Sequence, residues 1–189
     1  MGGMAAHSFM VPLGTPAPSF DLPAVGGGNV SLADFEGSPT LVIFLSNHCP
    51  YVRHIEHGLG ELAADYGSRL SIVAICSNDS EQYPDDDAAH LAEQAARAKF
   101  TFPYLLDETQ EVAKAYRAAC TPDFFLYDAD HKLVYRGEFD GSRPRNDVPV
   151  TGSSLRAAID AVLAGKPLDG DQAPSIGCGI KWKPGNEPA

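Results

Sequence analysis

The most constraining feature of the sequence is a cysteine at the junction between an apolar run and a helical pattern. The run LVIFLS at residues 41–46 is continuously hydrophobic, which is typical of a strand buried on both faces in a mainly parallel sheet. After Cys49 and Pro50, apolar residues recur at spacings of four, three and four, and Pro50 suits the first turn of a helix. These residues are Ile55, Leu59, Leu62 and Tyr66. The chain is therefore predicted to pass from a buried strand into a helix through a turn that carries Cys49.

The rest of the chain predicts an α/β domain with the element order β-α-β-α-(α)-β-β-α. Further strands are expected at 70–76, 123–128 and 132–139, and the last two form a hairpin. Further helices are expected from Asp85 to about 99, at 109–117 and at about 154–163. The turn-rich residues 11–40 indicate irregular structure or a small hairpin that leads into the domain.

Three parts of the chain are expected to differ in order. Residues 1–10 are expected to be a flexible N-terminus, 11–166 the folded domain and 167–189 a C-terminal tail. Within the tail, apolar residues alternate with Gly and Lys, which places one set on a single face of an extended segment. That set is Ile176, Cys178, Ile180 and Trp182. We expect the tail to pack on the domain with Cys178 pointing inward.

Composition limits the classes of protein and partner. The 189 residues are 44% hydrophobic and 21% charged, which fits one compact domain, as a monomer or a homodimer. The net charge of −11 argues against nucleic acid as a partner, and no apolar run is long enough to span a membrane. The start MGGMAAHSFM lacks the features of a signal peptide, so a cytoplasmic location is expected.

The position of Cys49 favours a reactive thiolate. First-turn amides and the helix dipole stabilise negative charge there, and such positions lower a cysteine pKa into the range of about 3.5–7.5. Arg53 lies four residues on, and His48 and His54 flank the turn. A metal site is not expected, because the only acidic residue nearby, Glu56, lies on a different helix face.

Several motifs resemble the AhpC/TSA (redoxin) family. GTPAPSFDL, SLADFEG and the SNHCPYV turn with its single cysteine follow in the family's order, and the resemblance covers residues 11–166. It implies a thioredoxin-like fold, with a central mixed β-sheet flanked by helices. It also implies that Thr121-Pro122 is the cis-proline loop beside the active-site cysteine, where a disulfide substrate pairs with exposed backbone.

The sequence departs from two patterns among these proteins. Val52 stands where thioredoxin has its second cysteine. Ser46 matches the hydroxyl position of peroxiredoxins, but Val42 occupies their proline position, and no arginine stands at Thr121-Pro122, the segment where peroxiredoxins carry one. A thiol that resolves the oxidised Cys49 must therefore come from elsewhere.

Two cysteines are candidates for that resolving thiol. Cys120 is the first, because it precedes the Thr121-Pro122 loop, and Cys178 on the tail is the second. Cys76 ends a buried strand and is expected to be a packing residue.

The resulting hypothesis is a thiol–disulfide oxidoreductase with Cys49 as its nucleophile. Ser46 and Arg53 are expected to support the thiolate. Positioning of the substrate is assigned to four residues: Thr121, Pro122, His48 and Pro50. No cofactor is implied, and the expected partners are a disulfide substrate and an external thiol reductant such as thioredoxin.

Two alternatives stay open. One is a peroxiredoxin-like peroxidase that reduces hydroperoxides. The other is a non-catalytic redox sensor or metal- or haem-binding protein that uses His48, Cys49 and His54. The basic residues Arg143 and Arg145 are expected in an exposed loop.

Overall fold

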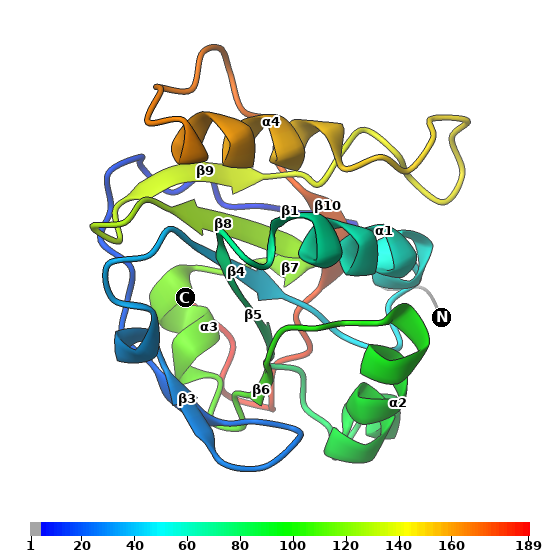
Figure 1. Ribbon diagram of the computed structural model, residues 1–189. Coiled ribbons are helices and arrows are strands. Elements are labelled where there is room, and N and C mark those ends of the chain that lie inside the picture. The colour runs from blue at the N-terminus through cyan, green and yellow to red at the C-terminus, as the bar shows by residue number, and fades with distance from the viewer. Residues whose placement is uncertain (1–4) are drawn as a thin grey trace.

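A five-stranded mixed sheet forms the centre of the molecule in the computed structural model, which describes residues 5–189. The strand order is β6-β5-β4-β8-β9 (Figure 1). The strands are β4 (Thr40–Phe44), β5 (Ser71–Cys76), β6 (Tyr104–Leu106), β8 (Asp123–Tyr127) and β9 (Leu133–Gly137). β4, β5 and β6 run parallel, whereas β8 runs antiparallel to both β4 and β9. The prediction of an α/β fold with a central mixed sheet is confirmed.

Helices cover both faces of this sheet, because the side chains of β4 alternate between two buried clusters. Leu41 and Ile43 pack with residues of α1, α2 and α4 on one face, and Val42 and Phe44 pack with α3 on the other. The helices are α1 (Pro50–Tyr66), α2 (Ala88–Ala98), α3 (Glu111–Tyr116) and α4 (Ser153–Leu163), with 3-10 turns η1 (Leu32–Phe35) and η2 (Pro84–Asp86). No helix within residues 5–189 has the length and apolar character needed to cross a membrane.

The N-terminal region contributes a small hairpin. β2 (Asp21–Pro23) pairs antiparallel with β3 (Asn29–Ser31), and this segment closes the α3 side of the sheet. Residues 1–4 of the expected flexible N-terminus lie outside the described residues. Ala5–His7, in contrast, form strand β1, because the tail offers a strand with free backbone donors and acceptors beside them.

The tail returns to the body of the domain as strand β10 (Ile176–Gly179). β10 lies between β1 and β7 (Cys120–Thr121) and pairs antiparallel with both. In Figure 1 the orange-red end of the chain runs back beside α1, β1 and β7. This three-stranded sheet places residues of the tail next to the turn that carries Cys49.

Two details of the predicted order were wrong. β6 was not expected, because Tyr104–Leu106 is only three residues long and follows Pro103. The acidic stretch does not begin one continuous helix: η2 comes first, and Asp87 then caps α2 by accepting from the His90 amide at 3.0 Å.

Candidate active site

Cys49 is the N-cap residue of α1 and is fully buried. It follows β4 after a short turn, and Pro50 occupies the first turn of the helix. The Sγ atom of Cys49 lies 2.9 Å from Sγ of Cys178 and 3.2 Å from the carbonyl oxygen of Thr121. The structure therefore brings a second cysteine and the predicted proline loop to the candidate nucleophile.

Strand pairing fixes the position of Cys178. Cys178 lies opposite Thr121, and Gly179 lies opposite Cys120, in the β10–β7 register. The two backbones approach so closely that a Cβ atom at Gly177 would lie 2.1 Å from the Thr121 carbonyl oxygen. Only glycine fits at position 177 while β10 is in place, so Gly177 is part of what sets the sulfur–sulfur distance.

The pair of thiols is electrostatically unequal. The hydrogen bond from the Cys178 thiol lowers the pKa of Cys49 to about 6, against the opposing effect of burial. Backbone amides of Val52 and Cys178 add to the lowering. The same contact with Cys49, together with burial, raises the pKa of Cys178. Cys49 is therefore the thiolate near neutral pH, and Cys178 holds the shared proton.

The other two cysteines lie outside this pair. Cys120 is fully buried, and its Sγ contacts the Pro122 carbonyl oxygen at 3.6 Å. Burial raises the pKa of both Cys120 and Cys76. Of the two candidate resolving cysteines, the structure brings Cys178 rather than Cys120 to Cys49.

Ser46 and Arg53 contact neighbours of Cys49. The Ser46 hydroxyl lies 3.0 Å from the Thr121 hydroxyl, in a bond between the two segments on either side of the thiol pair. The exposed Arg53 side chain donates to the Asn47 carbonyl oxygen at 2.7 Å. Arg53 therefore holds the backbone of the turn, and Ser46 joins the turn to the proline loop through the Thr121 side chain. These contacts differ from the direct support of the thiolate that the sequence led us to expect.

Asp86 is the main residue of the site that sequence analysis missed. Its buried carboxylate accepts from the amides of Asn47 and His48, at 2.7 and 3.0 Å, and from the His48 ring and the Asn78 amide. The hydrogen bond to Asp86 raises the pKa of His48. Burial opposes ionisation of Asp86, but the bonds from His48 and Asn78 outweigh it and lower its pKa. One carboxylate thus fixes the turn immediately before Cys49.

The same network reaches the tail. Asn78 Oδ1 accepts from the Lys181 amide at 2.8 Å, while Asn78 Nδ2 donates to Asp86 at 3.0 Å. His48 also stacks on Tyr83, with ring centroids 5.2 Å apart. His48 therefore lies beside the site as expected, but its ring is held by Asp86 and Tyr83.

A second network surrounds Pro122, which follows Thr121 through a cis peptide bond. The Ser175 hydroxyl donates to the Pro122 carbonyl oxygen at 2.5 Å, and the Ser8 hydroxyl donates to Asp123 at 2.7 Å. The Ser175 amide in turn donates to the Ser8 hydroxyl at 2.9 Å. Burial raises the pKa of Asp123 to about 7. These bonds connect β1, the proline loop and the start of β10.

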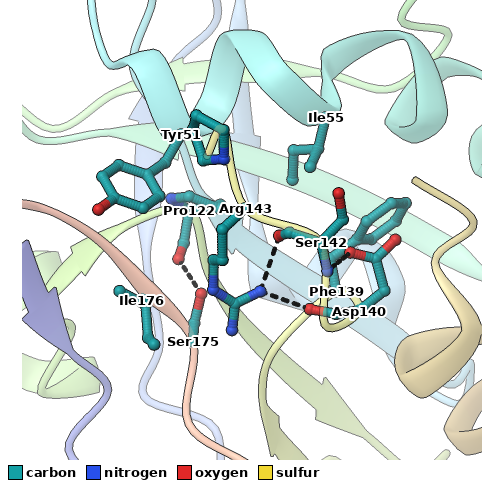
Figure 2. Close-up of a pocket in the computed structure, with 10 residues that line it drawn as sticks. Tyr51, Ile55, Pro122, Phe139, Asp140, Ser142, Arg143, Ser175 and Ile176 are labelled. Carbon is teal, nitrogen blue, oxygen red and sulfur yellow. Dashed lines mark hydrogen bonds between the residues drawn. The ribbon is translucent and has the colours of Figure 1, made fainter. Parts of the chain in front are cut away.

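A small pocket lies beside the segments that carry the thiol pair (Figure 2). Tyr51, Pro122 and Ile176 belong to these segments and line it together with Arg143. Arg143 and Arg145 were expected in an exposed loop, and Arg145 is exposed there. The Arg143 side chain is half-buried instead, and its guanidinium donates to the Asp140 and Ser142 carbonyl oxygens and to Glu138. Nε of Arg143 is buried and has no hydrogen-bond partner within residues 5–189.

The histidines near Cys49 have other partners. His54 Nε2 lies 2.7 Å from the Ser142 hydroxyl, and His48 pairs with Asp86. In the part of the chain that the structure describes, no group of three His, Cys, Asp or Glu side chains is arranged to hold a metal ion.

A protein-family model matches most of the domain. The AhpC/TSA family model matches residues 13–136, about two thirds of the chain. The chain belongs to the AhpC/TSA family. The matched segment contains Cys49 and the Thr121-Pro122 loop but ends before the tail with Cys178.

The sequence identity to a curated relative is low. A Mycobacterium tuberculosis (strain H37Rv) protein named "Putative peroxiredoxin Rv2521" is 31% identical over 105 residues, which are 56% of this chain and 63% of that protein. This chain therefore spans less than two thirds of that relative's length.

Solved structures show the fold over nearly the whole chain. An uncharacterized conserved protein from Geobacillus kaustophilus is 53% identical, with a TM-score of 0.94 over 97% of this chain and 99% of that one. A thiol:disulfide interchange protein of the thioredoxin family from Chlorobium tepidum TLS is 18% identical, with a TM-score of 0.63 over 80% of this chain and 98% of that one. The thioredoxin-like fold that the sequence motifs implied is therefore confirmed.

Proposed function

We propose that this AhpC/TSA-family protein is a thiol–disulfide oxidoreductase in which Cys49 and Cys178 alternate between a dithiol and a disulfide. The observation that carries the proposal is the 2.9 Å separation of the two Sγ atoms, which must shorten by about 0.85 Å to reach the bonded distance of about 2.05 Å. The lowered pKa of Cys49 supports its role as the attacking sulfur.

The reaction has two exchange steps. The Cys49 thiolate attacks one sulfur of a substrate disulfide, forms a mixed disulfide and releases the other substrate sulfur as a thiolate. Cys178 then attacks Cys49 Sγ and passes its proton to the departing substrate thiolate. The products are the Cys49–Cys178 disulfide, one substrate thiolate and one substrate thiol, so two electrons pass to the substrate. An external thiol reductant restores the dithiol by the reverse exchange.

The neighbouring residues position this chemistry. The Thr121 carbonyl oxygen contacts Cys49 Sγ, and Pro122 borders the adjoining pocket. Pro50 begins the helix whose first turn stabilises the thiolate. His48 lies at the partly exposed side of the turn, and its hydrogen bond to Asp86 raises its pKa, which favours a positive charge near the reacting sulfur.

A hydroperoxide is the second candidate substrate, because the same pair of sulfurs can reduce an O–O bond and a 31% identical relative is named as a peroxiredoxin. The Cys49 thiolate would attack the terminal peroxide oxygen to give a sulfenic acid and an alkoxide or hydroxide, which takes a proton from solvent to become an alcohol or water. Attack by Cys178 would then form the disulfide and release water.

Peptide mapping tests the proposal. Reduced protein is oxidised with one equivalent of hydroxyethyl disulfide, alkylated and digested under non-reducing conditions. A Cys49–Cys178 linked peptide is the expected product, and Cys178→Ala is expected to stop at a mixed disulfide on Cys49. Cys120→Ala serves as the matched control and should still form the link. A Cys49–Cys120 peptide, or Cys49 recovered as a free thiol, would contradict the proposal.

Rapid mixing with hydrogen peroxide separates the two substrates. A rate no faster than that of a free thiol would remove the peroxidase candidate and leave disulfide exchange.

A further inference from the structure

β10 occupies the strand edge beside the nucleophile. Substrates that are extended peptides can bind by adding a strand to an open sheet edge. Here the edge of β7 at Thr121 is already paired with β10, and Cys178 of that strand is placed at Cys49. The tail thus stands where a segment of a disulfide-bonded protein would have to pair.

We propose that β10 is an internal occupant of this edge and restricts the Cys49–Cys178 pair to small-molecule oxidants and small thiol reductants. The inference rests on the proposed function and specifies its substrate class. Disulfides within proteins are excluded as long as β10 is docked.

The fit between β10 and β7 leaves no room for a second strand. A single added carbon at Gly177 would lie 2.1 Å from the Thr121 carbonyl oxygen and 3.2 Å from Pro122 Cδ. The next glycine, Gly179, has its nearest neighbour at an ordinary 3.9 Å, from Ala6 Cβ. The close contact is therefore confined to the position next to Cys178.

Hydrogen bonds hold the tail on both sides of Cys178. Before it, Ser175 bonds to Pro122, and the Ser8 amide donates to the Ser175 carbonyl oxygen at 3.0 Å. After it, the Lys181 amide donates to Asn78, and the Lys181 carbonyl oxygen accepts from the Asp79 amide at 2.8 Å. An extended protein segment could reach the edge only after several of these bonds break.

Access to the sulfurs is correspondingly narrow. Cys49 has no exposed surface, and Cys178 is 9% exposed. The adjoining pocket is bounded by Tyr51, Pro122 and Ile176, each within two residues of Cys49, Thr121 or Cys178. A small disulfide or hydroperoxide needs only a local opening beside this pocket.

The test compares oxidants of different size in a single turnover. Pre-reduced protein is mixed with hydroxyethyl disulfide or with insulin at equal disulfide concentration, quenched with an alkylating reagent and mapped. Wild type is expected to react about 100-fold more slowly with insulin than with hydroxyethyl disulfide. Two or three hydrogen bonds of the tail must break first, and each contributes about 1 kcal/mol net. Gly177→Ala should speed the reaction of Cys49 with insulin at least about tenfold by displacing β10, and Gly179→Ala should behave as wild type.

Each outcome is distinct. Insulin reacting within about tenfold of the small disulfide would overturn the inference and leave the proposed function intact. Failure of both oxidants to form the Cys49–Cys178 disulfide would contradict the proposed function itself. Gly177→Ala that reacts with insulin as slowly as wild type would show that β10 is not the barrier.

A measurement on wild type alone covers the case in which Gly177→Ala does not fold. Reduced Cys49 is expected to react with iodoacetamide but not with a polyethylene-glycol maleimide. Equal labelling by both reagents would overturn the inference.

Discussion

Replacing Cys178 with alanine should raise the pKa of Cys49. The Cys178 thiol is the largest influence that lowers this pKa to about 6, while burial acts in the opposite direction and remains in the variant. A hydrogen bond to a charged group contributes about 1.5–3 kcal/mol, which corresponds to roughly 1–2 pKa units. The pKa of Cys49 in Cys178→Ala should therefore be about 7–8, and the thiolate fraction at pH 7 should fall from about 90% to between about 10% and 50%.

The pH dependence of thiolate absorbance is the assay of choice. A less acidic thiol is a stronger nucleophile once ionised, so a rate at one pH would mix two opposing effects. In wild type only Cys49 should titrate near neutral pH, because the pKa values of Cys76, Cys120 and Cys178 are all raised. The absorbance curve therefore reports one sulfur.

Two controls define the result. Cys178→Ser keeps a hydroxyl donor and should shift the pKa of Cys49 less than alanine does. Cys76→Ala removes a buried thiol elsewhere in the sheet and should leave the pKa unchanged. A wild-type Cys49 that titrates like an ordinary thiol, or a Cys178→Ala curve that superimposes on wild type, would refute the electrostatic argument.

Three further predictions concern stability. Asp86→Asn should lower the free energy of unfolding at pH 7 by about 2–4 kcal/mol in urea titrations, because amides of the Cys49 turn and the His48 ring lose their charged acceptor. The control Asp85→Asn, at an exposed position, should change the free energy of unfolding by less than about 0.5 kcal/mol. Burial raises the folded pKa of Asp123 from 3.8 to about 7, so its stabilising contribution is fully present below pH 3.8 and is lost as the pH rises toward 7. The wild-type unfolding free energy, measured against Asp123→Asn, should decline over that range, and a constant difference would contradict this. Leu91→Ala should cost about 2–5 kcal/mol, measured by chemical denaturation, since Leu91 is fully buried between α2 and the sheet; a loss below 1 kcal/mol would mean that the site collapses around the smaller side chain.

Much of the fold could be predicted from local patterns. The apolar run before Cys49 and the spacing of four, three and four after it identify β4 and α1, since each pattern belongs to one element. β6 was not predicted, because three residues are too few to show a repeating hydrophobic pattern.

The site was harder to predict, because it depends on register and on which side chain turns inward. The alternating pattern of the tail places Cys178 on its inner face. Only the β10–β7 register, however, puts Cys178 opposite Thr121 and makes it, rather than Cys120, the neighbour of Cys49. Asp85, Asp86 and Asp87 look equivalent in sequence, yet the short η2 turn buries only Asp86 against the amides before Cys49. Neither the register of β10 nor the burial of Asp86 can be recognised from the sequence pattern.

The anchors of the tail have a practical consequence for protein engineering. Residues 164–167 and 169–171 are exposed and connect α4 to a tail that bonds to β9 from Gln172 onward, where the Gln172 side chain accepts from the Arg136 amide at 3.1 Å. Ala173 then accepts from the Glu138 amide at 3.0 Å. Gln110 then binds Lys181, Lys183 and Asn186 beyond the strand. A cut in the exposed connection would leave every one of these contacts in place, so a synthetic peptide carrying Cys178 could complement the truncated domain and deliver a labelled or chemically altered sulfur to Cys49.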